Sequence, residues 1–391
     1  MPSTTSKRRP TGSHRKRGEP LGVPHTPYGA KTEKKPVALF VLGMGRSGTS
    51  ALTRVISLCG AALPPRLLGA DASNPLGLWE PRDAMDINEE ILYRRHSGWA
   101  DPSLRIHEES ASPEENAACI KTIAAFFATL PAEPLVVIKE PRISLLFNVW
   151  FEAARRAGFD VAIVIAVRHP DEVIKSLATR DRASQELASA LWLKYSLLAE
   201  RQTRGLPRVF VDYANFLKDW RAEIARVSTA LAIDFDTRDE RAIEEFLNPG
   251  LRREQSSGSV TDTFGTDWLS ATYEALHAAA QDEVLDQNTL DRVFDAFRAG
   301  EHDFRTALED FDEHFSLNTV LRRALFRPSI AKRLRAVVAF VTRLGFDPYQ
   351  RRYAKQQGLR TTKPAEIAPA GRAEPQRGQP HWRGGGVRSV G

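Results

Sequence analysis

Residues 36–59 read PVALFVLGMGRSGTSALTRVISLC, and this stretch decides the fold. Pro36–Gly43 is short, apolar and rich in β-branched residues, which predicts a fully buried strand. Ala51–Cys59 spaces its apolar residues as a helix does. Between them, Gly43–Ser50 contains the spacing G-x-x-x-x-G, in which glycines let backbone N–H groups converge on an anion at the N-terminus of the following helix. The stretch therefore predicts a strand, a phosphate-binding loop and a helix in succession.

Three further apolar runs predict buried strands, at Leu135–Ile138, Asp160–Val167 and Arg208–Val211. The stretches with helical spacing around them are Asp86–Tyr93, Glu114–Leu130, Ser144–Ala157, Glu172–Leu177 and Gln185–Arg201. Strands that alternate with amphipathic helices predict an α/β fold with a doubly wound, mostly parallel sheet. Ligands bind such sheets beyond the C-terminal ends of the strands. Because all four predicted strands end in charged or polar residues, we expect these ends to meet at one site.

The chain divides into four predicted regions. From about residue 262 onward we find no convincing strand pattern. The helices predicted in this part are Leu290–Phe297, Asp303–Phe315 and Ile330–Leu344. The expected regions are a disordered basic tail at 1–35, an α/β domain at 36–255, a helical extension packed on that domain at 256–345, and a second basic, Pro/Gly-rich tail at 346–391.

Basic residues are concentrated in the two tails rather than in the body. Residues 1–35 carry nine Lys/Arg and two acids, and residues 351–391 carry the same numbers, so the net charge of +6 leaves −8 for residues 36–350. Pro/Gly-rich basic tails are typical of solvated arms, with tethering to nucleic acid or to an anionic membrane as the alternative. The acidic body argues against a nucleic-acid groove across the domain, and we expect no nucleic-acid partner.

Cysteine content and hydropathy predict the compartment. Cys59 and Cys119 are the two cysteines, so a disulfide framework is implausible. No run of about 18 apolar residues predicts a membrane span, and the N-terminal residues lack the apolar stretch of a secretory signal. We therefore expect a cytoplasmic protein. The basic amphipathic stretch 330–344 leaves two alternatives open, packing on its own domain or peripheral contact with a membrane surface.

The phosphate-binding loop departs from that of ATP- and GTP-hydrolysing proteins at one position. Thr49 stands where the motif G-x-x-x-x-G-K-[ST] requires a lysine, so a triphosphate would lack its main side-chain cation. The cation of this loop is instead Arg46, which suits a shorter anion, namely a 5′-phosphate that carries one further group. Asp212 follows a predicted strand and could mimic the magnesium-binding acid of such proteins. A P-loop kinase or NTPase is therefore an alternative.

The loop resembles a known one. Arg46 precedes Ser-Gly-Thr in this chain, and in sulfotransferases that use 3′-phosphoadenosine 5′-phosphosulfate (PAPS) a Lys or Arg precedes Ser-Gly-Thr in the 5′-phosphosulfate loop. The similarity covers roughly residues 36–255 and is to bacterial and Golgi-type members rather than to cytosolic ones. It implies transfer of a sulfuryl group from PAPS, with adenosine 3′,5′-bisphosphate as the product. The residues that it implies for binding the 5′ end of PAPS are Gly45, Arg46, Ser47, Gly48, Thr49 and Ser50.

A second anion site is predicted at the end of another strand. Arg168 directly follows the predicted strand Asp160–Val167 and supplies a planar, permanently charged fork for phosphate oxygens. Ser176 lies two helical turns further on and adds a hydroxyl donor. This pair resembles the family's 3′-phosphate site, with Arg and Ser at the same separation. Two anion sites would match a nucleotide that is phosphorylated at both 5′ and 3′ positions, whereas an NTPase needs only one.

The resemblance also implies catalytic roles. Lys139 heads a Lys-Glu-Pro segment similar to the family's K-[DE]-P, whose lysine stabilises the sulfuryl oxygens or protonates the leaving group. Arg46 would hold the 5′-phosphate and the bridging oxygen. Asn74–Glu80 resembles the segment that carries a glutamate base in tyrosyl-protein sulfotransferases, so Glu80 is the first candidate for the base and Glu140 the second. Fixed cations can stabilise the developing charge, so no metal is expected.

Two departures from cytosolic members stand out. Ala51 stands where those members have the aromatic residue that stacks on adenine, and Tyr213, which resembles the tyrosine of their Y-E-D-L strand end, is the candidate to replace it. Their basic C-terminal loop is absent, and Asn248–Arg253 is the candidate to stand in for it. The acceptor class stays open among carbohydrates, lipids, small metabolites and peptides, as does the oligomeric state. A catalytically silent nucleotide-binding module is the third alternative.

Overall fold

The computed structural model describes residues 35–71, 74–108, 111–237, 239–247, 256 and 258–315. Residues 1–34 of the first tail, the predicted helix at Ile330–Leu344, the second tail and the candidate loop Asn248–Arg253 lie outside the described residues. The described chain forms a mixed α/β fold, as predicted.

The sheet has four parallel strands in the order β2-β1-β3-β4. They are β1 (Val37–Leu42), β2 (Leu135–Ile138), β3 (Asp160–Val167) and β4 (Arg208–Asp212). Each agrees with its predicted bounds to within one residue at either end. Phe40 of β1 is paired with Ile138 and Ile163, so the C-terminal ends of the three neighbouring strands lie at one edge of the sheet. The prediction of a parallel sheet is confirmed.

The helices are α1 (Thr49–Leu58), α2 (Arg82–Arg94), α3 (Arg105–Glu108), α4 (Pro113–Phe127), α5 (Ile143–Arg156), α6 (Pro170–Asp181), α7 (Gln185–Gln202), α8 (Tyr213–Lys218), α9 (Trp220–Leu231), α10 (Glu240–Phe246), α11 (Trp268–Ala280) and α12 (Gln287–Phe315). One prediction was wrong here, because Leu290–Phe297 and Asp303–Phe315 belong to a single helix that runs through Gly300. A glycine costs a helix interior only about 1 kcal/mol, which neighbouring good helix formers can offset.

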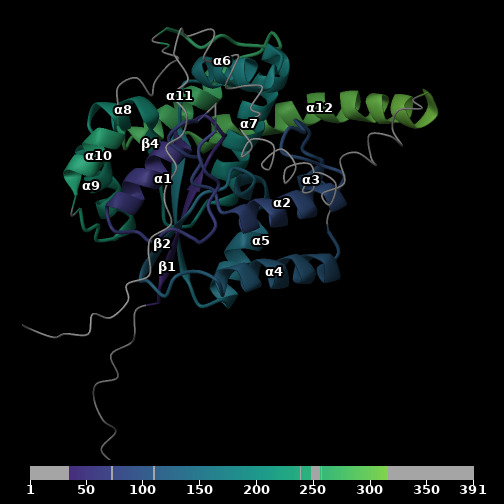
Figure 1. The fold of residues 1–391 in the computed structure, drawn as a ribbon. Helices are drawn as coiled ribbons and strands as arrows, with labels where there is room; N and C mark the ends of the chain where they lie inside the picture. The colour runs from purple at the N-terminus through teal and green to yellow at the C-terminus, as the bar shows by residue number, and fades with distance from the viewer. Residues whose placement is uncertain are drawn as a thin grey trace, which may run out of the picture.

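Helices cover both faces of the sheet, which makes it doubly wound. Leu39 and Val41 of β1 pack into a core shared with α1, α8, α9 and α10. Phe40 and Leu42 point to the opposite face and pack with residues of α4, α5, α7 and α11. Figure 1 shows α1, α8, α9 and α10 together on one side of the strands and α2, α4 and α5 on the other. Alternate residues of one apolar strand therefore serve two cores.

The helices after residue 262 share the core of the α/β body. Leu276 of α11 and Phe294 of α12 belong to the same buried cluster as Phe40 of the sheet. Among the described residues, no helix is both long enough and apolar enough to cross a bilayer.

Candidate active site

The phosphate-binding loop joins β1 to α1 and depends on Gly48. Gly48 takes a left-handed conformation with φ of 87°, and a Cβ there would lie 2.1 Å from Cδ2 of Tyr213. Both the conformation and the close approach demand glycine. No side chain caps α1, and its first turn contains no acidic residue. The N–H groups and the positive dipole end of α1 are therefore available to an anion above the loop.

The two predicted anion sites are in direct contact. Nε of Arg46, in the loop, donates a hydrogen bond of 2.9 Å to Oγ of Ser176 on α6. Nη1 of Arg168 donates one of 2.7 Å to the backbone carbonyl of Arg46. This second bond holds Arg46 in a left-handed conformation, with φ of 74°, that is uncommon for a residue other than glycine. Arg46, Arg168 and Ser176 therefore belong to one continuous site.

Arg168 is oriented from several directions. Its Nε bonds Oε2 of Glu172 at 2.7 Å, and Glu172 is fully buried. The second oxygen of Glu172 accepts a hydrogen bond of 2.9 Å from the backbone of Ser256. The guanidinium carbon lies 4.8 Å from the ring centroid of Tyr213. Because these contacts hold the guanidinium group, its orientation is fixed before any ligand binds.

Tyr213 and Asp212 have positions that differ from those the sequence suggested. The Tyr213 ring is 4% exposed and is packed by Gly48 and Arg168, so it offers little surface for stacking on adenine. Oδ1 of Asp212 caps α8 by accepting from the backbone of Ala214 and Asn215, at 2.8 and 3.0 Å. Its Oδ2 lies 3.3 Å from Nδ1 of His277. Asp212 is therefore a helix cap, which explains its place after a strand without a magnesium ion.

Lys139 lies immediately after β2 and is 2% exposed. Its Nζ donates three hydrogen bonds, to Oγ of Ser50 at 3.1 Å, to the carbonyl of Leu78 at 3.1 Å and to Oε1 of Glu80 at 2.6 Å. These use all three protons of an ammonium group. The fold therefore brings the predicted lysine, the predicted base and the end of the phosphate-binding loop into one cluster.

Glu80 is held by the backbone that surrounds it. Its carbonyl accepts a hydrogen bond of 2.8 Å from the backbone of Leu68, and the next residue, Pro81, forms a bridge with Leu67. Trp79 has φ of 58°, and the guanidinium carbon of Arg54 on α1 lies 4.6 Å from its ring centroid. These contacts place a 7% exposed carboxylate beside Lys139.

Glu140, the second candidate for the base, is fully buried. It accepts hydrogen bonds from Nδ2 of Asn88 at 2.5 Å and from the backbone of Arg142 at 3.1 Å, and it forms an ion pair with the Arg142 guanidinium. Burial raises the pKa of the Glu140 carboxyl, and Arg142 opposes this rise. Arg142 also bonds Glu89 of α2 at 3.1 Å. Glu140 therefore joins α2 to the start of α5, which is a structural role.

The sequence reasoning missed three residues of this region, namely Asn74, Asn88 and Arg142. Asn74 begins the segment that ends at Glu80. Spacing alone does not indicate that the Asn74 amide donates to Oγ of Ser50, at 3.2 Å. Asn88 lies on a predicted amphipathic helix. Its complete burial would have indicated a hydrogen-bonding role, but burial is known only from the fold. Arg142 follows Lys139-Glu140-Pro141 and could have been paired with Glu140 by proximity.

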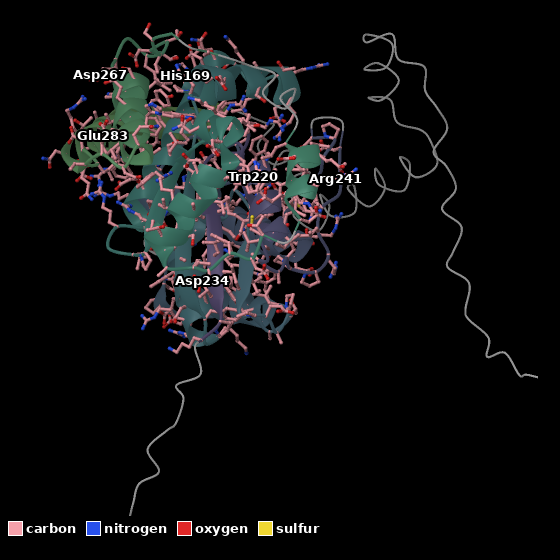
Figure 2. All side chains as sticks on the ribbon, turned by 90° about the vertical axis from the view of Figure 1, so that its left-hand side faces the viewer. His169, Trp220, Asp234, Arg241, Asp267 and Glu283 are labelled. Carbon is pink, nitrogen blue, oxygen red and sulfur yellow. The ribbon has the colours of Figure 1, made fainter. Side chains whose placement is uncertain are left out.

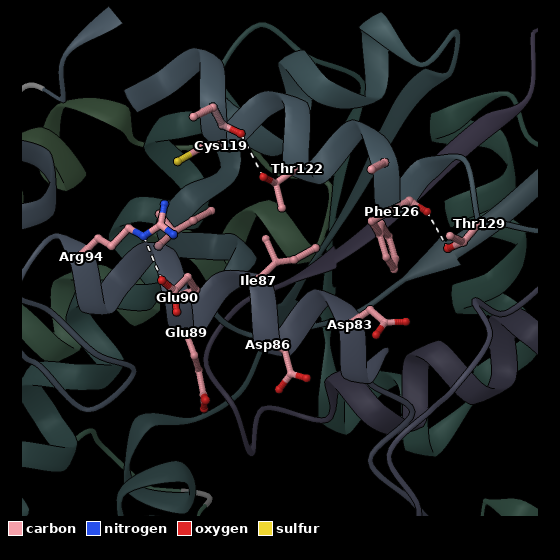
Figure 3. Close-up of a pocket in the computed structure, with 13 residues that line it drawn as sticks. Asp83, Asp86, Ile87, Glu89, Glu90, Arg94, Cys119, Thr122, Phe126 and Thr129 are labelled. Atoms are coloured by element: carbon pink, nitrogen blue, oxygen red, sulfur yellow. Dashed lines mark hydrogen bonds and ion pairs between the residues drawn. The ribbon is translucent and has the colours of Figure 1, made fainter. Parts of the chain in front are cut away.

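The site lies at one end of the molecule. His169 directly follows Arg168 at the C-terminal end of β3, and Figure 2 shows it near one end, with Asp234 near the other. A separate groove of about 570 Å³ lies between α2 and α4, where Figure 3 shows Ile87 on one side and Cys119 on the other. Of the predicted site residues, none is among the described residues that line this groove.

No family model matches the chain, and no curated protein matches it. Several solved structures do, and two of them are sulfotransferase domains. One is the sulfotransferase domain from the olefin synthase of Synechococcus PCC 7002, with 22% identity, a TM-score of 0.32, and coverage of 68% of this chain and 97% of that one. The other is the sulfotransferase domain from the curacin biosynthetic pathway, with 15% identity, a TM-score of 0.33, and coverage of 66% and 90%.

Proposed function

We propose that this chain is a sulfotransferase that moves a sulfuryl group from PAPS to a hydroxyl or amine. The observation that carries the proposal is the contact between Arg46 and Ser176. It joins the loop expected to bind a 5′-phosphosulfate to the helix expected to bind a 3′-phosphate, and a nucleotide phosphorylated at both positions needs both.

The residues at the loop fit the 5′ end of such a nucleotide. The uncapped N-terminus of α1 supplies N–H donors, and Ser47 and Thr49 line the same turn. Arg46 supplies the cation that a P-loop NTPase takes from its lysine. At the other end, Arg168 and Ser176 would hold the 3′-phosphate by charge-assisted hydrogen bonds. PAPS supplies a sulfuryl group already activated by its bond to a phosphate.

The transfer that we propose is a single in-line displacement. A lone pair of the acceptor oxygen or nitrogen forms the new bond to sulfur, and the bond from sulfur to the bridging oxygen breaks. The electron pair of that bond stays on the 5′-phosphate of adenosine 3′,5′-bisphosphate. The proton of the acceptor goes to Glu80, which acts as the general base.

Lys139, which bonds Glu80, would serve the same step at the leaving group. Its Nζ lies 3.1 Å from Ser50, in the first turn after the phosphate-binding loop, so a small movement brings it to a sulfuryl or bridging oxygen. There it stabilises the charge that develops as the bond breaks. The same movement separates Nζ from Glu80, which leaves the carboxylate able to accept a proton. The ion pair of 2.6 Å is then the resting state of two catalytic residues.

Two observations favour sulfuryl transfer over nucleotide hydrolysis. Thr49 replaces the phosphate-binding lysine of P-loop NTPases. Asp212 is the residue that could have held magnesium, but its oxygens have other partners. Oδ1 accepts a hydrogen bond from the backbone of Ala214, and Oδ2 lies beside His277.

We further propose a carbohydrate, lipid or small metabolite as the acceptor. We propose the cytoplasm as the compartment because both cysteines are unpaired.

The experiment that tests this proposal is incubation of the full chain with PAPS labelled at sulfur and a panel of glycans, lipids and small phenols. We expect label to move to one acceptor class and Lys139→Ala to abolish that movement. Exposed Lys175, which directly precedes Ser176 in the middle of α6, supplies the control Lys175→Ala. Equal transfer by Lys139→Ala would remove its catalytic role. Nucleotide binding without transfer to any acceptor would favour the silent module.

A further inference from the structure

The hydroxyl of Ser50 is the centre of a saturated set of hydrogen bonds. It donates to the carbonyl of Leu78 at 3.2 Å. It accepts from Nζ of Lys139 at 3.1 Å and from Nδ2 of Asn74 at 3.2 Å. A hydroxyl has one proton and two lone pairs, so these three bonds use its full capacity. Through them the first turn of α1 holds both the catalytic lysine and the segment that carries Glu80.

The local backbone fixes Asn74 at this place. Its N–H donates to Oδ1 of Asp71 at 2.7 Å, and its carbonyl accepts from the N–H of Gly77 at 3.0 Å. Gly77 has φ of 101°, which lets the chain turn directly after Pro75 and Leu76. The turn presents the Asn74 amide to Ser50 at the start of the segment, while Glu80 lies at its end.

An anion at the loop would change two of the three bonds. To donate to the anion, Ser50 must withdraw its single proton from the carbonyl of Leu78. Lys139, in the proposed transfer, turns toward the sulfuryl group and leaves Glu80. The bond from Asn74 does not compete with either change, because it uses a lone pair of Ser50 and a proton of its own. It is the contact that can persist when nucleotide is bound.

We infer that Asn74 is a positioning residue for the proposed transfer. Its amide keeps the Asn74–Glu80 segment on the first turn of α1 after Ser50 and Lys139 have turned to the nucleotide. Glu80 is thereby set at a fixed distance from the phosphate-binding loop, and hence from the acceptor proton. This role rests on the proposed function, but the attachment of the segment to α1 does not.

The test combines amide hydrogen exchange with kinetics on the full chain. The variants are Asn74→Ala, the conservative Asn74→Gln, and Asn148→Ala as a matched control at an exposed position on α5. In Asn74→Ala we expect faster exchange at the amides of Gly77, Leu78 and Arg82, which bond within or beside the segment. We expect saturation with adenosine 3′,5′-bisphosphate to widen the difference in exchange rate between variant and wild type. The bound nucleotide would also remove the bond from the Ser50 hydroxyl to the carbonyl of Leu78.

The kinetic expectation separates positioning from a general loss of structure. Loss of one hydrogen bond lowers kcat about five- to tenfold in Asn74→Ala, while the Kd of the bisphosphate stays close to that of the wild type. Asn74→Gln, which keeps an amide donor, recovers part of kcat. Exchange at all three amides equal to that in Asn148→Ala overturns the inference, and so does a parallel loss of kcat and nucleotide affinity.

The exchange arm also distinguishes this inference from the proposed function. Absence of sulfuryl transfer in the wild type, together with faster exchange in Asn74→Ala, rejects the proposed function and keeps the attachment. Transfer in the wild type, with unchanged exchange and unchanged kcat in Asn74→Ala, keeps the function and rejects the role of Asn74.

Discussion

Glu80 and Glu140 are two buried carboxylates that pair with cations at the same end of β2, yet their partners belong to different parts of the molecule. Glu80 bonds Lys139, which in turn bonds Ser50 beside the phosphate-binding loop. Glu140 bonds Arg142 and Asn88, which lead to α5 and α2. The first carboxylate is connected to the proposed nucleotide site, and the second holds two helices together.

Burial alone therefore does not distinguish a carboxylate proposed as a base from a structural one. Glu80 is 7% exposed and Glu140 is 0% exposed, which is a small contrast. The number of fixed partners is more informative. Glu140 accepts from an amide, from a backbone N–H and from a guanidinium, so it has no reason to move. The bond that Glu80 accepts comes from a flexible lysine that has other acceptors to turn to.

The largest expected effect is on kcat and comes from the loss of the Glu80 carboxylate. Glu80→Gln should lower kcat by about 10²- to 10⁴-fold, because a general base contributes that much to proton transfer. Glu140→Gln, the matched control, should retain a rate per folded molecule close to that of the wild type. Steady-state rates, normalised to the folded fraction from circular dichroism, measure both. Similar losses in the two variants would mean that the partner sets do not separate the roles.

The next largest effect is on stability and comes from the loss of the Arg142 guanidinium. Arg142→Met leaves Glu140 and Glu89 without their shared cation, and uncompensated buried charge costs about 3–5 kcal/mol of unfolding free energy. Denaturant unfolding should show this loss. Exposed Arg156, which pairs with Glu152 on the same helix, gives the control Arg156→Met, expected to cost less than about 1 kcal/mol. Equal costs would show that Glu140 is not held by a buried pair.

A third prediction extends the comparison to Glu172, a buried carboxylate that orients Arg168, the proposed 3′-phosphate ligand. Arg168→Lys keeps the charge but loses the planar fork, so the Kd of adenosine 3′,5′-bisphosphate should rise about 10- to 100-fold. Affinity for adenosine 5′-phosphosulfate, which has no 3′-phosphate, should change far less. Arg180→Lys, exposed on α6 with Glu172, is the control. An equal loss for both nucleotides would place Arg168 away from the 3′-phosphate.

A further prediction concerns Lys194, a fully buried lysine that donates to the carbonyl of Asp101 at 2.8 Å rather than to a carboxylate. Burial lowers its pKa to about 8, and Asp101 and Glu301 oppose the shift. The unfolded chain therefore binds more protons than the folded one between about pH 8 and pH 10.4.

Stability should rise with pH across that window, relative to Lys194→Met, by at most about 1.4 kcal/mol per pH unit. Denaturant unfolding of both proteins at several pH values measures the difference. A difference that is flat from pH 8 to 10 would mean that Lys194 keeps its proton in the folded state.

The strands and the loop could be predicted because their signals are local. A strand buried on both faces is a continuous apolar run, and a phosphate-binding loop needs glycines at fixed spacing, so β1 and Gly48 follow from a short stretch. The helices α8 to α11 were missed. Asp212 illustrates why, since an aspartate after a strand serves equally as a metal ligand or as the cap of a short helix.

The contacts that build the site could not be predicted, because they join distant parts of the chain. Arg46 and Ser176 are 130 residues apart, and Lys139 and Glu80 are 59 apart. The resemblance placed each residue in a role but not beside its partner. For Tyr213 the resemblance matched the position but not the role. Its ring is packed by Gly48 and Arg168 instead of lying open to stack on adenine.

The most direct measurement of the central claim is a calorimetric titration of the wild-type chain with adenosine 3′,5′-bisphosphate, set beside one with ATP and magnesium. If Arg46 and Arg168 together hold the two ends of one nucleotide, the bisphosphate binds with one site per chain and clearly more tightly than ATP. Tighter binding of ATP, or no binding of the bisphosphate, would contradict the account.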